Sequence, residues 1–115
     1  MLVVEDEIAL AELFEIWLDD AYTVDTVTNG SDALDRMEHA YDAIVLDWRM
    51  PEVSGADVLA HIHDERLSPG VAVVTGMELD EDDIEMSVDA ILRKPVRAEQ
   101  LLDTIDSIIA APGAS

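Results

Sequence analysis

Carboxyl, hydroxyl and amino side chains lie just beyond the ends of four short apolar runs of this sequence. The residues in these positions are Glu5 and Asp6, Asp47, Thr75 and Lys94. Clustered carboxylates bind Mg²⁺ through oxygen, and a cation beside a hydroxyl can hold a phosphoryl group. Phosphoryl transfer depends above all on positioning and charge neutralisation, so an aspartate can be the nucleophile. These residue types therefore indicate phosphoryl transfer to a carboxylate, with Asp47 as the best-placed acceptor.

Each of these residues also has an ordinary structural explanation. Asp6, Asp47 or Thr75 could cap a helix or a turn, and Lys94 could be a surface cation. A site explains the four positions better when they are taken together, provided that the apolar runs are neighbouring strands. Lys94 adds a further observation, because it is the only lysine in the chain while arginine supplies the other five cations.

The spacing of the apolar residues predicts the elements that would bring these side chains together. Short apolar runs predict strands at residues 2–4, 22–27, 43–46, 71–74 and 90–92. Helical spacing predicts helices within residues 10–18, 33–37, 58–64 and 101–109. In the first helix, the residues expected on the buried face are Leu10, Leu13, Phe14, Trp17 and Leu18. The acidic segment 77–89 has few apolar positions and predicts a short or irregular helix.

Five strand–helix repeats in 115 residues predict one three-layer α/β domain with a parallel sheet and right-handed crossovers. In such open sheets, ligands bind outside the carboxyl ends of the strands, at the point where the strand order reverses. The acidic, hydroxyl and lysine side chains described above would share this edge. The predicted fold would therefore bring residues that are distant in the sequence together in one site.

The charge balance of the chain is strongly acidic. Asp and Glu number 27 against 6 Lys and Arg, which gives a net charge of −21. Such a charge argues against nucleic acid as a direct partner and is typical of proteins that work at high salt, where screening relieves self-repulsion.

The absence of cysteine excludes disulfides. No apolar stretch approaches the roughly 20 residues of a membrane helix, so we expect a halophilic, cytoplasmic protein without membrane contact.

Four separated stretches of the sequence form recognisable motifs: LVVEDE at 2–7, VLDWRMPEVSG at 45–55, VVTG at 73–76 and LRKP at 92–95. Together they resemble the motifs of response-regulator receiver domains, which belong to the CheY-like superfamily. The resemblance implies a flavodoxin-like, doubly wound (βα)5 fold whose five-stranded parallel sheet has the order 2-1-3-4-5. It also implies a receiver domain over residues 1–110, followed by a tail or the start of a linker at 111–115.

The resemblance gives each site residue an expected role in phosphoryl transfer. Asp47 would accept the phosphoryl group, while Thr75 and Lys94 would contact its oxygens. The peptide bond between Lys94 and Pro95 is expected to be cis, which proline permits at modest cost. Mg²⁺ is the expected cofactor, and its implied ligands are Asp6, Asp47, the backbone carbonyl of Arg49 and, through water, Glu5.

By the same resemblance, the protein is a signalling switch of a two-component phosphorelay and not an enzyme with turnover. A sensor histidine kinase would supply the phosphoryl group from a phosphohistidine. Only self-catalysed acceptance and slow hydrolysis of the acyl phosphate are expected. Phosphorylation would bias a surface formed by the segment 77–89, the strand 90–92 and the last helix. This surface would control an output domain or partner, and could also form a homodimer.

Two features depart from the usual pattern of the family. Receivers often carry an aromatic switch residue three positions before the lysine, where this sequence has Ile91. The stretch from Thr75 to Lys94 is also shorter than usual, and EMSVDAILRKPV at 85–96 resembles haloarchaeal receivers that precede a HalX domain. A HalX-like output domain is therefore expected in the full-length chain.

Two other functions remain as alternatives. An aspartate-dependent Mg²⁺ phosphohydrolase would also pair a nucleophilic carboxylate with a metal and a lysine. Such enzymes commonly need a second aspartate two residues beyond the nucleophile, and Arg49 holds that position. A pseudo-receiver that acts only as an interaction module is the other alternative, although the set of site residues is complete.

Overall fold

The computed structural model describes residues 1–37, 39, 41–67, 69–76 and 88–110 of the chain. Its strands are β1 (Leu2–Val4), β2 (Asp25–Val27), β3 (Ala43–Asp47), β4 (Gly70–Thr75) and β5 (Ala90–Arg93). Its helices are α1 (Ile8–Asp19), α2 (Gly30–Arg36), α3 (Gly55–Asp64) and α4 (Ala98–Ala110). Within these described ranges, no helix is long and apolar enough to cross a membrane.

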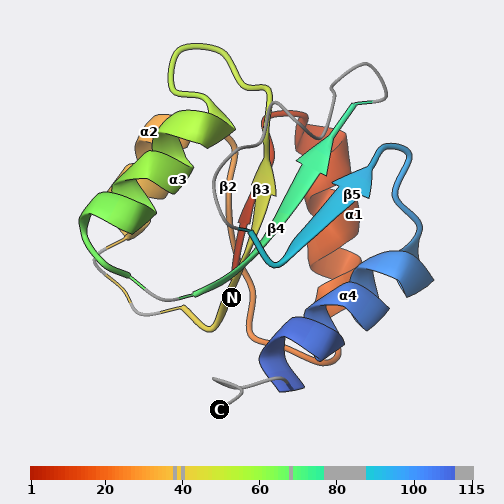
Figure 1. The fold of residues 1–115 in the computed structure, drawn as a ribbon. Helices are drawn as coiled ribbons and strands as arrows, with labels where there is room; N and C mark the ends of the chain where they lie inside the picture. Colours follow the sequence, from red (N-terminus) through yellow and green to blue (C-terminus); the bar gives the residue numbers. More distant parts are fainter. Residues whose placement is uncertain (38, 40, 68, 77–87, 111–115) are drawn as a thin grey trace.

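The strands form one parallel sheet in the order β2-β1-β3-β4-β5, as predicted. Helices α2 and α3 lie side by side on one face, and α1 and α4 lie on the other (Figure 1). Each strand sends alternate side chains to opposite faces, so the sheet carries a core on each side. The three-layer, doubly wound α/β fold is therefore confirmed.

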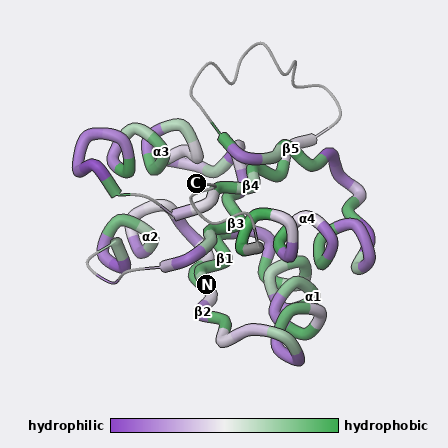
Figure 2. Tube along the Cα trace, turned by 60° about the horizontal axis from the view of Figure 1, so that its bottom comes forward, coloured by the Kyte–Doolittle hydropathy of each residue, from purple (hydrophilic) through white to green (hydrophobic). Residues whose placement is uncertain are grey.

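The apolar residues of the strands and the inner helix faces form these two cores. Leu46 from β3 and Leu59 from α3 belong to the core on the α2–α3 side. Val45 belongs to the core on the opposite side, with Phe14 from α1 and Leu101 from α4. Figure 2 shows the apolar residues concentrated along the strands, with hydrophilic residues on the outer turns of the helices. Strands buried on both faces explain why the sequence shows apolar runs there without alternation.

The structure corrects two details of the sequence prediction and leaves a third untested. Leu13 is 43% exposed and does not lie on the buried face of α1, because that face follows Ala11, Phe14 and Leu18. Strand β2 begins at Asp25, so the predicted strand at 22–27 is too long by three residues. The helix predicted within 77–89 lies almost entirely outside the described residues, which resume at Val88.

Two residues other than glycine have a left-handed backbone. Glu52 has φ of 65° and Arg66 has φ of 56°. This region of the backbone map costs a residue with a side chain about 1–2 kcal/mol, whereas glycine enters it freely. Arg66 follows α3 in a Schellman turn, in which its N–H donates to the carbonyl of His63 and the N–H of Leu67 to that of Ile62.

We expect Glu52→Gly to stabilise the protein by about 1 kcal/mol, because it removes the left-handed strain from an exposed loop position. Urea unfolding in molar salt measures the change. Glu52→Ala removes the same charge but keeps the strain, so this control should show no comparable gain. Equal stabilisation by both variants would assign the effect to charge and contradict the backbone explanation.

Candidate functional site

The parallel register places the predicted site residues at one edge of the sheet. Glu5 and Asp6 follow β1, Asp47 and Thr75 end β3 and β4, and Lys94 follows β5. Val4 pairs with Leu46, Asp47 with Val74, and Thr75 with Arg93, so these strand ends are level with one another. The fold therefore brings the predicted residues together at this edge.

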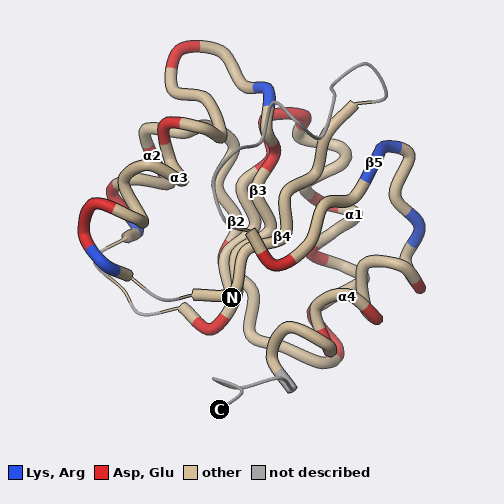
Figure 3. The backbone as a smooth tube through the Cα atoms, in the orientation of Figure 1, with Lys and Arg blue, Asp and Glu red and all other residues tan. Residues whose placement is uncertain are grey.

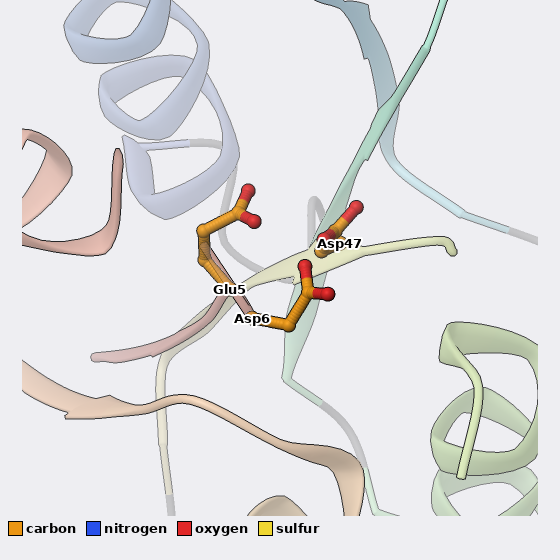
Figure 4. A group of neighbouring side chains, drawn as sticks. All are labelled: Glu5, Asp6 and Asp47. Atoms are coloured by element: carbon orange, nitrogen blue, oxygen red, sulfur yellow. The ribbon is translucent and has the colours of Figure 1, made fainter. Parts of the chain in front are cut away.

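Three carboxyl groups meet at this edge. Glu5, Asp6 and Asp47 each offer an oxygen within 4.8 Å of the other two. Figure 4 shows the carboxyl groups of Asp6 and Asp47 facing each other, with that of Glu5 beside them. Glu5 and Asp47 are 1% and 2% exposed, whereas Asp6 is exposed. The site is thus a buried pair of carboxylates with a third one open to solvent.

Lys94 supplies the positive charge of the site. Its Nζ lies 3.3 Å from Oε1 of Glu5 and 3.6 Å from Oδ1 of Asp47. The other oxygen of Glu5 accepts a hydrogen bond from the backbone N–H of Glu7, 3.1 Å away, at the start of α1. Glu5 therefore holds Lys94 in place from a position between β1 and α1 that this hydrogen bond fixes.

The crowding of acids changes the proton affinity of the carboxyl groups. Burial, reinforced by hydrogen bonding to Asp6 and Glu5, raises the pKa of Asp47 from its ordinary 3.8 to about 8. The hydrogen bond that Asp47 shares with Asp6 lowers the pKa of Asp6. Burial alone would lower the pKa of Lys94, but the carboxylates of Asp47 and Glu5 outweigh it and raise that pKa. Asp47 therefore binds a proton more tightly than an ordinary aspartate does.

The carboxylate arrangement fits a magnesium ion. Oδ2 of Asp47 is buried and has no hydrogen-bond partner in the described part of the chain. A buried carboxylate oxygen without a partner is costly, and a cation that binds it removes the cost. Mg²⁺ takes oxygen ligands in an octahedron with bond lengths of about 2.0–2.1 Å, so opposite ligands lie about 4 Å apart. The carboxylate oxygens of Glu5, Asp6 and Asp47, within 4.8 Å of one another, are close enough to share one such ion.

The other predicted site residues lie around the carboxylates. Thr75 is 1% exposed, and within the described part of the chain its hydroxyl makes only a long contact of 3.5 Å with the carbonyl of Gly76. The peptide bond between Lys94 and Pro95 is cis, as the resemblance implied. Ile91 is half-buried and packs on the core beneath α2 and α3. Arg49 is exposed, two residues beyond Asp47.

The loop after Asp47 is fixed by contacts that the sequence analysis missed. The N–H of Trp48 donates to the carbonyl of Val74, and the N–H of Gly55 returns to the carbonyl of Trp48. Ser54 and Asp57 then form a reciprocal capping box at the start of α3. A serine followed three residues later by an acidic residue is the sequence signal that could have revealed this cap.

Gly55 lies against the backbone that carries Asp47. A Cβ at this position would lie 2.5 Å from the carbonyl oxygen of Asp47 and 2.7 Å from Cα of Trp48. Both neighbours are backbone atoms, which cannot move aside as a flexible side chain can. Gly55 therefore lets the start of α3 pack directly on the end of β3.

A parallel α/β sheet with clustered acids, a hydroxyl and a lysine at its carboxyl edge defines a phosphoryl-accepting class of domain. Residues 1–106 match the family described as "Response regulator receiver domain". The match covers most of the chain, so the chain belongs to this receiver family. The phosphohydrolase and pseudo-receiver alternatives gain no support from it.

Similar proteins agree with this assignment. The chain is 39% identical over 114 residues to a candidate transcriptional regulator of Haloferax volcanii, covering 98% of this chain and 20% of that protein. It is 32% identical over 114 residues to response regulator ArlR of Staphylococcus aureus, covering 95% of this chain and 52% of that protein. The chain thus spans about a fifth and about half of the length of these two relatives.

A solved structure shares the fold. Response regulator protein TrrA from Thermotoga maritima, solved in complex with Mg²⁺ and BeF, has a TM-score of 0.84 and 27% sequence identity. The similarity covers 93% of this chain and 96% of that one. A Haloferax relative also agrees with the halophilic composition predicted from the net charge.

Proposed function

We propose that Asp47 accepts a phosphoryl group from a phosphohistidine of a sensor histidine kinase. The observation that carries this proposal is the setting of Asp47: it is 2% exposed, ends β3, and lies 3.6 Å from the only lysine of the chain. Glu5 and Asp6 flank it. A carboxylate in this setting can attack a phosphoryl group that the cation and neighbouring donors neutralise.

In the transfer, an ionised oxygen of Asp47 attacks phosphorus and the bond from phosphorus to the imidazole nitrogen breaks. The histidine leaves as neutral imidazole once its nitrogen takes up a proton, and the aspartate becomes an acyl phosphate. Lys94 lies on the side of Oδ1 and stabilises the ionised carboxylate before the attack. Thr75, with a hydroxyl that has only a long contact, is placed to donate to a phosphoryl oxygen.

When bound, Mg²⁺ would neutralise the phosphoryl charge next to the carboxylates. We assign its ligands to Asp6, Asp47 and the backbone carbonyl of Arg49, with Glu5 acting through water. The assignment draws support from the spacing of the three carboxylates and from the buried oxygen of Asp47 that lacks a partner among the described residues.

The acyl phosphate would draw Thr75 and Lys94 toward the phosphoryl oxygens and so bias the adjoining surface. This surface comprises the segment 77–89, strand β5 with Ile91, and α4. Because Ile91 has no aromatic ring, its packing rather than a ring flip would report the state of the site. We propose that the surface controls an output domain, HalX-like in a longer chain, or a homodimer.

The remaining parts of the proposal concern the domain and its setting. The receiver domain is assigned to residues 1–110, and 111–115, which lie outside the described residues, to a tail or linker. The protein would act in the cytoplasm as a switch without enzymatic turnover and without direct contact with nucleic acid or membrane. Its excess of carboxylates, spread over helices and loops in Figure 3, supports the lack of direct contact with nucleic acid.

Incubation with Mg²⁺ and acetyl phosphate in molar salt tests the proposal. We expect one phosphoryl adduct by intact mass, lost slowly on standing. The adduct should be absent without Mg²⁺. Sustained release of phosphate from a phosphomonoester would instead identify a phosphohydrolase and overturn the proposal.

Replacing Lys94 by alanine should separate phosphorylation from the switch. Mg²⁺ binding should be no weaker, because the variant removes a cation from beside the carboxylates. The change at β5 on phosphorylation should disappear, since it depends on movement of Lys94. Amide chemical shifts of residues 88–93 before and after acetyl phosphate measure this, with exposed Arg97→Ala as the control. If phosphorylation changed these amide shifts in Lys94→Ala as much as in the natural protein, Lys94 would have no role in passing the change from Asp47 to β5.

A further inference from the structure

The loop at residues 48–54, which joins β3 to α3 at the top of Figure 1, packs against the start of α2. The first residue of α2 is Gly30, which is buried. A Cβ at Gly30 would lie 2.6 Å from both Cβ and Cγ1 of Val53, and closer still to the carbonyl oxygen of Val53. Only a residue without a side chain therefore allows α2 to begin this close to the loop.

The helical conformation of Gly30 gives no other reason for a glycine. Within a helix, glycine is a poor choice because it loses more conformational freedom on folding than any other residue. Asn29 already caps the helix, since its side chain accepts a hydrogen bond of 2.7 Å from the backbone N–H of Asp32. Alanine at residue 30 would suit the helix itself, so the close approach to Val53 is what requires glycine.

The loop that meets α2 carries an expected magnesium ligand, the backbone carbonyl of Arg49. Its two ends are tied together, because the N–H of Gly55 donates to the carbonyl of Trp48 at 3.0 Å. Between these ends, Met50 is 8% exposed and belongs to the core on the α2–α3 side. A short loop held in this way has little freedom to absorb a displacement of Val53.

The start of α2 is in turn tied to the strand that leads to the acidic residues. The N–H of Glu5 donates to the carbonyl of Val27 at 3.1 Å, which joins the end of β1 to the end of β2. Only two residues separate Val27 from α2. The contact of Gly30 with Val53 therefore connects the carboxylates that follow β1 with the loop that follows β3.

We propose that Gly30 is a positioning residue for the magnesium site. By letting α2 lie directly against Val53, it holds the loop so that the carbonyl of Arg49 and the carboxylate of Asp47 can bind the same ion. Replacing residues that orient metal ligands commonly changes metal affinity about 10- to 100-fold. This inference rests on the proposed magnesium site, and specifically on the carbonyl of Arg49 as a ligand.

Gly30→Ala tests this role. The new Cβ must displace the loop or α2, so the dissociation constant for Mg²⁺ should rise about tenfold or more. Titration of ¹⁵N-labelled protein with MgCl₂ in molar NaCl measures the affinity from amide shifts. The amide shifts of residues 48–54 should differ from those of the natural protein before any Mg²⁺ is added. With acetyl phosphate, the Mg²⁺ concentration for half-maximal rate should rise by the same factor, while the rate at saturating Mg²⁺ falls by about twofold at most.

Gly70→Ala is the control for a new clash far from the site. A Cβ at Gly70, at the start of β4, would meet Cγ2 of Ile108 on α4. This variant should unfold at a lower urea concentration than the natural protein and yet bind Mg²⁺ with unchanged affinity. Equal losses of Mg²⁺ affinity in Gly30→Ala and Gly70→Ala would contradict a specific role for Gly30.

Val53→Ala tests the same contact without introducing a clash, and so does not depend on Gly30→Ala being folded. It removes Cγ1, which lies next to Gly30, and should weaken Mg²⁺ binding about threefold or more. Because both substitutions disturb one contact, the loss of affinity in the double variant should be smaller than the product of the two single losses. Losses that multiply would show that the two residues act independently, against the proposal.

The titration separates this inference from the magnesium site on which it rests. If the natural protein binds Mg²⁺ and both Gly30→Ala and Val53→Ala bind it as tightly, the role of Gly30 is wrong and the magnesium site stands. If the natural protein binds no Mg²⁺, the magnesium site itself is wrong, and the role of Gly30 with it.

Discussion

Replacing Asp47 by asparagine is expected to stabilise the metal-free protein at pH 8 by on the order of 2–4 kcal/mol while it abolishes phosphorylation. Burial and the neighbouring carboxyl groups raise the pKa of Asp47 to about 8, so ionisation of this side chain opposes folding. Asparagine has nearly the same shape and keeps a donor toward Asp6. The ionised carboxylate that phosphorylation needs therefore lowers the free energy of unfolding.

The pH dependence of this effect has a definite sign. Because the pKa of Asp47 in the folded protein lies above its ordinary 3.8, the group contributes its full stability below about pH 4. That contribution is lost as the pH rises toward about 8. The difference in unfolding free energy between Asp47→Asn and the natural protein should thus be small at pH 4 and grow up to pH 8.

Urea unfolding at several pH values in molar salt, without divalent cations, measures this difference. Exposed Asp103→Asn is the control for removal of one charge. Added Mg²⁺ should stabilise the natural protein but not Asp47→Asn, since ligand binding to the folded state alone raises its stability. A difference that stays constant from pH 4 to pH 8 would show that the Asp47 carboxyl is not strained in the fold.

Gly55→Ala is expected to destabilise the protein by about 2–3 kcal/mol and to slow phosphorylation about tenfold or more. The new Cβ would lie 2.5 Å from the carbonyl oxygen of Asp47 and 2.7 Å from Cα of Trp48, so either α3 or the end of β3 must shift. Alanine gains up to about 1 kcal/mol over glycine within a helix. The clash with two backbone atoms outweighs that gain.

Gly76→Ala is the matched control for Gly55→Ala. A Cβ at Gly76 would meet no heavy atom of the described residues within 4 Å, although this glycine also lies next to a site residue. Urea unfolding and the rate of adduct formation from acetyl phosphate give the two measurements. If Gly55→Ala were as stable and as reactive as Gly76→Ala, the close packing of α3 on β3 would have no role in positioning Asp47.

The sequence could predict the fold and the meeting of the site residues because both follow from one regularity. Each apolar run buried on both faces ends at a polar residue, and parallel strands bring such ends to one edge. Asp47 and Thr75 each end a strand, and the residues after β1 and β5 are Glu5 and Lys94. Order along the chain was therefore enough to place the site.

Other features depend on contacts between distant segments, which the sequence pattern does not contain. Leu13 fits helical spacing as well as Phe14 does. Which of the two is buried depends on how α1 is rotated about its axis when it packs on the sheet. The pairing of Lys94 with Glu5 as well as Asp47 depends on side-chain reach across the sheet. The left-handed backbone of Arg66 gave no signal, because arginine is not the residue that this turn favours.

Reductive trapping of the phosphorylated protein tests the acceptor assignment most directly. Borohydride delivers a first hydride to the acyl carbon of an aspartyl phosphate, which releases phosphate and leaves an aldehyde. A second hydride and a proton from water then reduce the aldehyde to an alcohol at that residue. Peptide mass mapping after acetyl phosphate, Mg²⁺ and borohydride should find this reduced side chain at Asp47 and at no other carboxylate. A reduced side chain at Asp6 or Glu5, or an adduct carried by a histidine that borohydride leaves unchanged, would contradict the account.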